Sequence, residues 1–191
     1  MKCKKIAALV LLGSIIGGTY VSSIPQAHAQ SGSERIEVQV NGSSVSDAGV
    51  IIDGKTYLSV RELQDTIQGF IYWDAANKKL YIDKPNVHMM TFKDKNMFGK
   101  VQTGKTTFSV HVQVDDLKSK VDGIRLSIVD PNGKSTDIEQ SKLSAQEDNF
   151  WFRSKDFSYD FKSKGKYTVN CYLKQQNGDY TLVSKKTLDA I

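Results

Sequence analysis

Apolar and polar side chains alternate along most of the second half of the chain, with the period of two that is typical of β-strands. The clearest run covers residues 108–114, where apolar side chains alternate with Ser109, His111 and Gln113. About seven such runs over about 100 residues predict an antiparallel β-sandwich of the immunoglobulin-like class. The residues predicted to face its core are Phe108, Val110, Val112, Val114, Ile124, Leu126, Ile128, Phe150, Phe152, Phe157, Tyr159, Phe161, Tyr167, Val169, Cys171 and Leu173.

The segment Gly-Lys-Tyr-Thr-Val at 165–169 resembles the tyrosine corner of immunoglobulin-like domains. In that comparison Tyr167 is the corner tyrosine, and Val169 stands where antibody-type domains carry their second cysteine. The predicted sandwich therefore lacks that disulfide. Cys171 falls on the same alternating face, which predicts a small buried apolar residue and not a nucleophile.

The segment before residue 85 has a different pattern, in which short strands flank one helix. Asn41-Gly42 and Asp53-Gly54 are hairpin signals between apolar runs. Ser59 and Glu62 have the spacing of a capping box, and the apolar positions that follow predict a helix over 60–68. Gly69 is predicted to end it in the left-handed conformation. With strands at 70–73 and 80–82, the order β-β-α-β-β predicts a small α+β domain.

Four short segments of this region, VNG, IIDGKTYLSVREL, QGFIYWD and KKLYI, occur in this order between residues 36 and 84. Together they resemble the copper amine oxidase-like N-terminal (stalk) domain. The resemblance implies a small antiparallel sheet on one helix, and it implies nothing about copper. The positions taken as its structural motif are Ser59, Arg61, Glu62, Gly69, Trp73 and Asp74.

The pair Trp73-Asp74 has two interpretations. In the structural one, Trp73 fills the space against the helix, and the Asp74 carboxylate accepts backbone amides at the start of a turn. In the functional one, Asp74 is a general acid, which needs a partner carboxylate that the sequence does not single out. The structural interpretation is favoured.

The first 29 residues have the composition of a secretory signal peptide. Lys2, Lys4 and Lys5 precede an apolar run at 6–16, and small residues lead to a cleavage site after Ala29. The alternative is an uncleaved anchor, but the run is well short of the ~20 apolar residues that a span needs. The predicted organisation is a signal peptide at 1–29, the stalk-like domain at 30–85 and the immunoglobulin-like domain at 86–191. No membrane association is expected after cleavage.

Removal of the leader changes the charge and the cysteine count. The whole chain has a formal net charge of +5, but three lysines leave with the leader, so 23 basic residues face 21 acidic ones. This balance does not indicate a nucleic-acid partner. Of the two cysteines only Cys171 remains, so an intrachain disulfide is excluded.

Metal and cofactor sites are not indicated by the sequence. The mature chain has two histidines, His88 and His111, in different predicted strands, and they are predicted to be surface residues. Asp130 and Asn132 begin like a calcium loop, but serines stand where that loop needs its glycine and its glutamate. The acidic pairs at 115–116 and 147–148 are predicted to be solvated turn residues. We therefore expect no metal and no cofactor.

Trp151 and Arg153 are the strongest candidates for ligand binding. If Phe150 and Phe152 face the core, alternation places an indole and a guanidinium side by side on the solvent face of a sheet. Exposed aromatic rings stack on sugar rings, and Trp and Arg are favoured at protein interfaces. The alternative is that a neighbouring loop or the first domain covers Trp151.

These observations predict a secreted, non-catalytic binding or spacer protein that acts at or outside a Gram-positive cell surface. No phosphate loop, nucleophile elbow or zinc helix is found, so an enzyme is not expected. The expected partner is a cell-wall polymer or an extracellular protein. The alternative function is a secreted inhibitor or regulator of an extracellular enzyme such as a protease, which would offer the segments 115–123 or 139–149.

Overall fold

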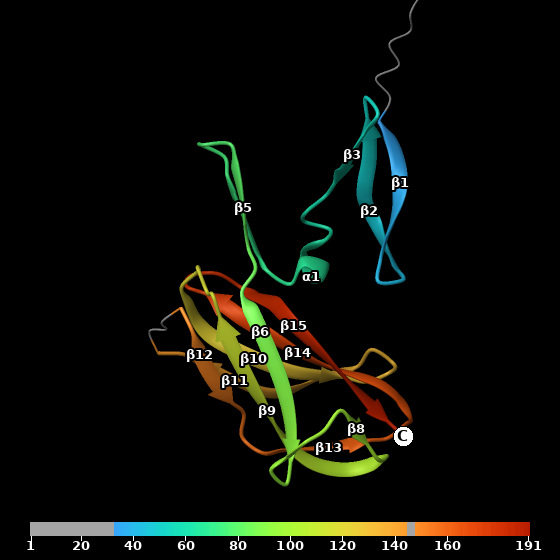
Figure 1. Cartoon of the computed structure of the whole chain (residues 1–191), viewed down its shortest axis with the longest axis vertical. Coiled ribbons are helices and arrows are strands. Elements are labelled where there is room, and N and C mark those ends of the chain that lie inside the picture. The colour runs from blue at the N-terminus through green and yellow to red at the C-terminus, as the bar shows by residue number, and fades with distance from the viewer. Residues whose placement is uncertain (1–32, 145–147) are drawn as a thin grey trace, which may run out of the picture. The chain divides into compact units, whose positions relative to one another are not determined.

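The structure is a computed structural model that describes residues 33–144 and 148–191 (Figure 1). The predicted signal peptide at 1–29 and the acidic residue Glu147 lie outside the described residues. Strands account for most of the described chain. Within these ranges, no helix is long and apolar enough to cross a bilayer.

We call residues 33–84 the N-terminal region and residues 86–191 the sandwich region. The N-terminal region contains β1 (Glu34–Val40), β2 (Ser43–Ile52), β3 (Lys55–Leu58), α1 (Gln64–Ile67), β4 (Phe70–Asp74) and β5 (Lys79–Asp83). The sandwich region contains β6 (Asn86–Lys93), β7 (Asn96–Met97), β8 (Lys100–Val101), β9 (Gly104–Asp115), β10 (Val121–Val129), β11 (Ser135–Lys142), β12 (Phe150–Arg153), β13 (Phe157–Phe161), β14 (Gly165–Gln175) and β15 (Tyr180–Ala190). The predicted boundary at Pro85 falls between β5 and β6 and stays a prediction.

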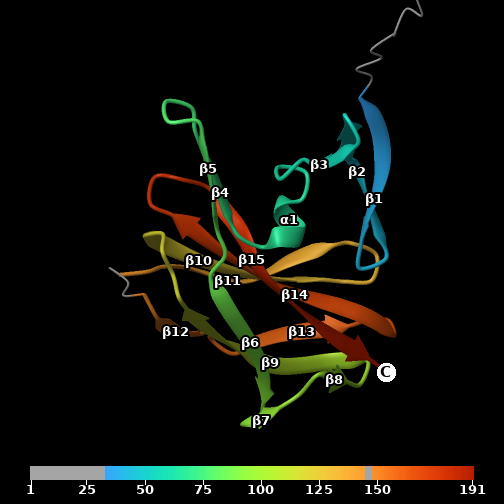
Figure 2. The ribbon, with the colours of Figure 1, turned by 45° about the horizontal axis from the view of Figure 1, so that its top comes forward.

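Two sheets make up the sandwich region, and their strands can be followed in Figure 2. The first has the strand order β11-β10-β14-β15-β8. The second has the order β12-β9-β6-β7, and β13 also pairs with β9. All of these pairs are antiparallel except β15 with β8. This arrangement is compatible with the predicted immunoglobulin-like sandwich.

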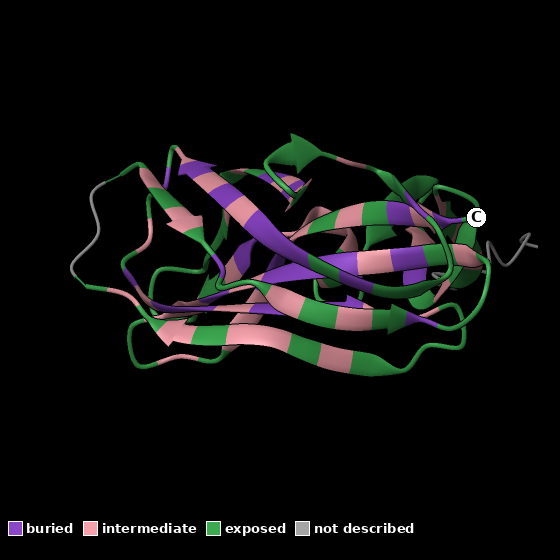
Figure 3. Ribbon diagram, turned by 90° about the horizontal axis from the view of Figure 1, so that it is seen from below, coloured by how far each residue is buried: buried purple, intermediate pink, exposed green. Residues whose placement is uncertain are grey.

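The core of the sandwich is formed by the inward rows of both sheets, and Figure 3 shows these buried positions alternating along the strands. The sequence predicted most of this core correctly. The predicted inward residues that are buried are Phe108, Val110, Val112, Val114, Ile124, Leu126, Ile128, Phe161, Tyr167, Val169, Cys171 and Leu173. Phe150, Phe152, Phe157 and Tyr159 are half-buried and pack against this core.

The predicted tyrosine corner is present near the start of β14. The Tyr167 side chain is buried, and its hydroxyl donates a hydrogen bond to the Ser163 carbonyl oxygen at 3.0 Å. The same hydroxyl oxygen accepts the Ser163 amide at 3.3 Å. The corner thus ties the chain four residues upstream to the buried end of the strand.

The α+β prediction for the N-terminal region is wrong. Three strands, not two, precede the helix, and the strands form two separate sheets, β1-β2-β3 and β4-β5. The helix has only four residues, so the region consists almost entirely of strands and turns. The predicted β-β-α-β-β domain, with one sheet packed on a helix, is not formed.

The helix is short because little holds its first turn in the helical form. Residues 60–63 form turns: the Leu63 amide donates to the Ser59 carbonyl oxygen at 3.2 Å, as in an α-helix, but the Gln64 amide donates to the Arg61 carbonyl oxygen at 3.2 Å, which is three residues back. The Glu62 amide reaches the Ser59 hydroxyl at 3.4 Å, but the Ser59 amide donates to the Ala48 carbonyl oxygen instead. Only half of the predicted capping box is therefore made. A helix without a large buried face is marginal.

Two further predictions in this region need correction. The left-handed residue that ends the helix is Gln68, with φ of 55°, and not Gly69. Gly69 is required for another reason, because a Cβ there would lie 2.8 Å from the Asp83 carbonyl oxygen. Trp73 does not fill the space against the helix, since its side chain is 53% exposed.

The predicted role of Asp74 is confirmed. One carboxylate oxygen accepts the amides of Ala76 and Asn77, each at 3.0 Å, and the other accepts the Asn77 side-chain amide at 2.8 Å. These hydrogen bonds, led by that of the Asn77 side chain, lower the pKa of Asp74 below its usual value. Asp74 thus holds the turn between β4 and β5 in its charged form.

Candidate functional site

A group of outward-facing side chains lies across β12, β9 and β6. Residues directly opposite one another in antiparallel strands point to the same side of the sheet. Trp151 lies opposite Gln113, which lies opposite His88, and Arg153 lies opposite His111 in the next row. We call this group the outer face, and it consists of His88, Met90, Phe92, His111, Gln113, Trp151 and Arg153.

Alternation along β12 orients the two predicted ligand-binding residues. Phe150 and Phe152 pack against the core, so Trp151 and Arg153 point away from it. Both are exposed, and the Trp151 side chain is 66% exposed. The structure therefore places the indole and the guanidinium as predicted, and the residues that it describes around Trp151 leave the indole exposed.

Ser154 fixes the chain directly after Arg153. Its side chain is buried, and its hydroxyl oxygen accepts the Val110 amide at 2.9 Å. Its own amide donates to the Val110 carbonyl oxygen at 2.9 Å. These two hydrogen bonds hold the segment that carries Arg153 and Asp156 against β9.

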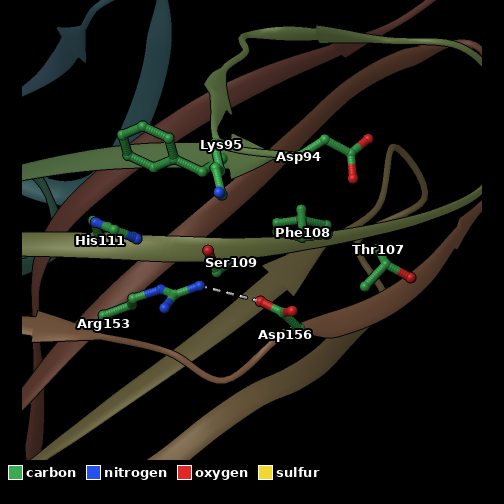
Figure 4. Close-up of a pocket in the computed structure, with 9 residues that line it drawn as sticks. Asp94, Lys95, Thr107, Phe108, Ser109, His111, Arg153 and Asp156 are labelled. Carbon is green, nitrogen blue, oxygen red and sulfur yellow. Dashed lines mark hydrogen bonds and ion pairs between the residues drawn. The ribbon is translucent and has the colours of Figure 1, made fainter.

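A cavity of about 500 Å³ lies beside the Arg153–His111 row (Figure 4). Figure 4 shows His111 and Ser109 on β9, with Lys95 on one side of them and Arg153 and Asp156 on the other. The Phe92 and His111 rings lie 4.4 Å apart between centroids. The lining residues are Phe92, Asp94, Lys95, Thr107, Phe108, Ser109, His111, Arg153 and Asp156.

The charges around the cavity balance. Arg153 and Asp156 form an ion pair at 3.5 Å, and both side chains are exposed, so the pair contributes little to stability. Lys95 and Asp94 supply one further charge of each sign. Burial, and next the positive charge of Arg153, lower the pKa of His111 below its usual value. His111 is therefore neutral at neutral pH and can both donate and accept a hydrogen bond.

The outer face does not bring the two histidines together as a metal site. His111 lies opposite Met90 and Arg153, and His88 lies in the neighbouring row. Within residues 33–144 and 148–191, no group of three or more His, Cys, Asp or Glu side chains is arranged to hold a metal ion.

Two other candidates from the sequence, the calcium-like loop at Asp130 and the thiol of Cys171, have structural roles. The Asp130 carboxylate accepts the amides of Asn132 and Lys134, each at 2.9 Å, so it closes a turn. Cys171 is fully buried, and burial raises the pKa of its thiol to about 12. A thiol in this state is a poor nucleophile at neutral pH.

The motif residues of the N-terminal region have local roles apart from the outer face. Arg61 and Glu62 lie in the turns before α1, Ser59 directly precedes these turns, and Gly69 lies after the helix. Trp73 and Asp74 end β4. The candidate site thus consists entirely of sandwich residues.

Several residues of the site were not predicted from the sequence. Phe92, Asp94 and Lys95 enter it because β6 pairs with β9, and that pairing cannot be read from alternation alone. His111 was predicted to be a surface residue, whereas the structure makes it half-buried in the lining of the cavity. The ion pair of Arg153 with Asp156 could have been predicted, because the two opposite charges are only three residues apart in the sequence.

In comparisons with known proteins, no family model matches the chain. No curated protein matches it either. The resemblance to the copper amine oxidase-like N-terminal domain stays a prediction that rests on its short motifs.

Proposed function

We propose that the protein is a secreted, non-catalytic binding module that recognises a neutral glycan of a Gram-positive cell wall through its outer face. One observation carries the proposal. An exposed Trp151 lies one row from a cavity that combines ring surfaces with hydrogen-bonding groups and has balanced charges.

The side chains of the outer face fit a chain of sugar rings. An exposed indole offers a flat apolar surface, on which the C–H face of a sugar ring stacks. Gln113 lies opposite Trp151, and its side-chain amide nitrogen donates a hydrogen bond to the Asp115 carboxylate at 2.8 Å, so polar groups lie beside the indole. Alternating rows of the sheet lie about 7 Å apart, so a ligand on Trp151 extends directly to His111 and Arg153.

The charge balance favours uncharged sugars over an anionic wall polymer. Arg153 and Lys95 are matched by Asp156 and Asp94, and His111 is neutral. A site for a polyanion would instead show an excess of basic groups. Paired carboxylate and guanidinium groups are suitable partners for hydroxyl groups.

The extracellular location rests on the leader. Its basic start, apolar run and small residues before position 30 support export. The absence of a disulfide is no obstacle, because the sandwich buries a continuous apolar core.

The test is co-sedimentation of the chain Ser33–Ile191 with an insoluble wall fraction. We expect Trp151→Ala to weaken retention by about tenfold. This is the usual scale when a tryptophan that becomes buried in the complex is removed. Trp73→Ala is the matched control, since it removes an equally large exposed indole from the N-terminal region and should leave retention unchanged.

The wall fraction is tested both with its anionic polymers and after their removal. Equal retention on both supports a neutral glycan. Loss of retention after removal would contradict it, as would equal retention of Trp151→Ala and the unchanged protein. Capture of one secreted enzyme from culture supernatant, without wall retention, would favour the inhibitor or regulator function instead.

A further inference from the structure

Strand β5 presents a free edge to solvent. Within the part of the chain that the structure describes, β5 pairs only with β4, in a two-stranded sheet. Leu80, Tyr81 and Ile82 are 43–49% exposed, although all three are large apolar or aromatic residues. An isolated two-stranded hairpin is marginally stable, and an open edge is a template for pairing with another strand.

The sequence of β5, Lys-Leu-Tyr-Ile-Asp, is complementary to itself in the antiparallel direction. If two copies of β5 run antiparallel about a two-fold axis at Tyr81, Lys79 lies opposite Asp83 of the second copy, and the reverse pair forms as well. Leu80 then lies opposite Ile82, and Tyr81 opposite Tyr81. Opposite charges and apolar pairs in directly facing positions both stabilise a sheet.

We propose that two copies of this chain form a homodimer by antiparallel pairing of their β5 edges, with the two-fold axis at Tyr81. The result is a four-stranded sheet with the order β4-β5-β5-β4. Each interface position is used identically by both copies, as a two-fold interface requires. The inference is independent of glycan binding.

The neighbouring side chains fit this arrangement. Tyr72 and Tyr81 already stack across the hairpin, with ring centroids 6.1 Å apart. Pairing at Tyr81 extends this into a row of four tyrosines on one face of the sheet. On the other face, Leu80 and Ile82 of one copy meet those of the second and shield apolar surface that a single chain leaves in water.

The opposite edge of the hairpin is not suited to the same pairing. A two-fold axis at the centre of β4 would place Phe70 opposite Asp74, with no charge pair formed. Phe70 is also buried against the sandwich core, which ties that end of β4 to its own chain. Charge complementarity and exposure therefore single out β5.

The main test is sedimentation equilibrium of the chain Ser33–Ile191, which forms one compact unit. The unchanged protein should show a monomer–dimer equilibrium. Lys79→Glu and Asp83→Lys should each weaken the dimer by about tenfold or more, because each converts two attractive pairs into two repulsive ones. A mixture of the two variants should restore dimers, since each repulsive group then meets an opposite charge.

Lys55→Glu is the matched control, because it makes the same charge change at an exposed end of β3, away from the pairing strand. It should dimerise like the unchanged protein. A chain that stays monomeric at high concentration would overturn the proposal. So would charge variants that dimerise normally, or a mixture that fails to restore dimers.

Asp83 accepts a hydrogen bond from the Ser119 hydroxyl at 2.7 Å, so Asp83→Lys also removes a contact within the chain. A second measurement therefore tests the pairing without changing Asp83. Tyr81→Cys places two thiols face to face on the axis, and mild oxidation should give a disulfide-linked dimer. Tyr72→Cys is the control: Tyr72 is more exposed than Tyr81, at 63% against 49%, but it lies one strand further from the axis in each copy, so it should not cross-link. Equal cross-linking of both variants, or of neither, would contradict the pairing. The remaining cysteine, Cys171, is buried and does not interfere.

Discussion

The sandwich region and the N-terminal region both consist mainly of strands, but they use their apolar residues differently. In the sandwich region, the inward rows of two sheets cover each other and form a continuous core. In the N-terminal region, the sheets β1-β2-β3 and β4-β5 remain separate. Among the described residues, eleven large hydrophobic residues are exposed, and eight of them lie in the N-terminal region: Ile52, Tyr57, Leu58, Tyr72, Trp73, Leu80, Tyr81 and Ile82.

The difference shows that alternation specifies a strand without specifying what covers it. A strand row is buried only when a second sheet or a helix of sufficient size lies against it. The sandwich has such a partner for every inward row, whereas the four-residue helix α1 cannot cover the β4–β5 hairpin. Exposed apolar surface of this kind marks an interaction site, which is the basis for the proposed dimer.

The largest expected effect is on the free energy of unfolding, when one aromatic side chain in each region is replaced by alanine. Phe108→Ala removes a buried ring that contacts Phe98 and Phe157, and it should lower the free energy of unfolding by about 3–5 kcal/mol. Trp73→Ala removes a larger but half-exposed ring and should cost less than about 1 kcal/mol. Urea unfolding followed by circular dichroism measures both. Similar losses for the two variants would contradict the contrast between the regions.

A smaller effect is expected at the tyrosine corner. Tyr167→Phe keeps the buried ring but removes the hydroxyl that bonds the Ser163 backbone, and it should cost about 1–2 kcal/mol. Tyr72→Phe changes an exposed tyrosine on the hairpin and should change stability by at most a few tenths of a kcal/mol. The same urea experiment compares them. If Tyr167→Phe were neutral, the corner would not contribute to the stability of β14.

The smallest expected effect is the pH dependence of the β4–β5 turn. Because the pKa of Asp74 is lowered on folding, its stabilisation is present above the unfolded pKa of about 3.9 and is lost as the pH falls through the folded value. Asp74→Asn should therefore differ most from the unchanged protein at neutral pH and least in acid. Thermal unfolding across this pH range measures the difference.

Asn77→Ala is the companion variant, because the Asn77 side chain is the largest cause of the lowered pKa. It should move the Asp74 carboxyl back toward its usual pKa in an NMR titration. A carboxyl that titrates as before would mean that the turn hydrogen bonds do not stabilise its charged form.

The sandwich could be predicted from the sequence because its strands bury one full face. Each inward position of β9, from Phe108 to Val114, is apolar and buried, and the alternate positions are polar, although Ser109 among them is also buried. The Tyr167 corner was predictable because it is a local motif whose hydrogen bonds span only four residues.

The rest depended on contacts that are distant in sequence. The helix prediction failed because capping and spacing at Ser59 and Glu62 describe only local preference, and no buried face supports it. Trp73 was predicted to pack against this helix, in a small core that the N-terminal region does not form. At the outer face, the outward orientation of Trp151 and Arg153 could be predicted from alternation in β12, but Phe92 joins them only through the pairing of β6 with β9.

The most direct test of the central claim is an NMR titration of the isotope-labelled chain Ser33–Ile191 with soluble, uncharged fragments of wall glycan. The account predicts that the largest shifts occur at the Trp151 indole N–H and at the amides of His111, Gln113 and Arg153, while the Trp73 indole N–H stays unchanged. Shifts centred on Trp73, or no shifts at all at ligand concentrations that saturate wall binding, would contradict recognition by the outer face.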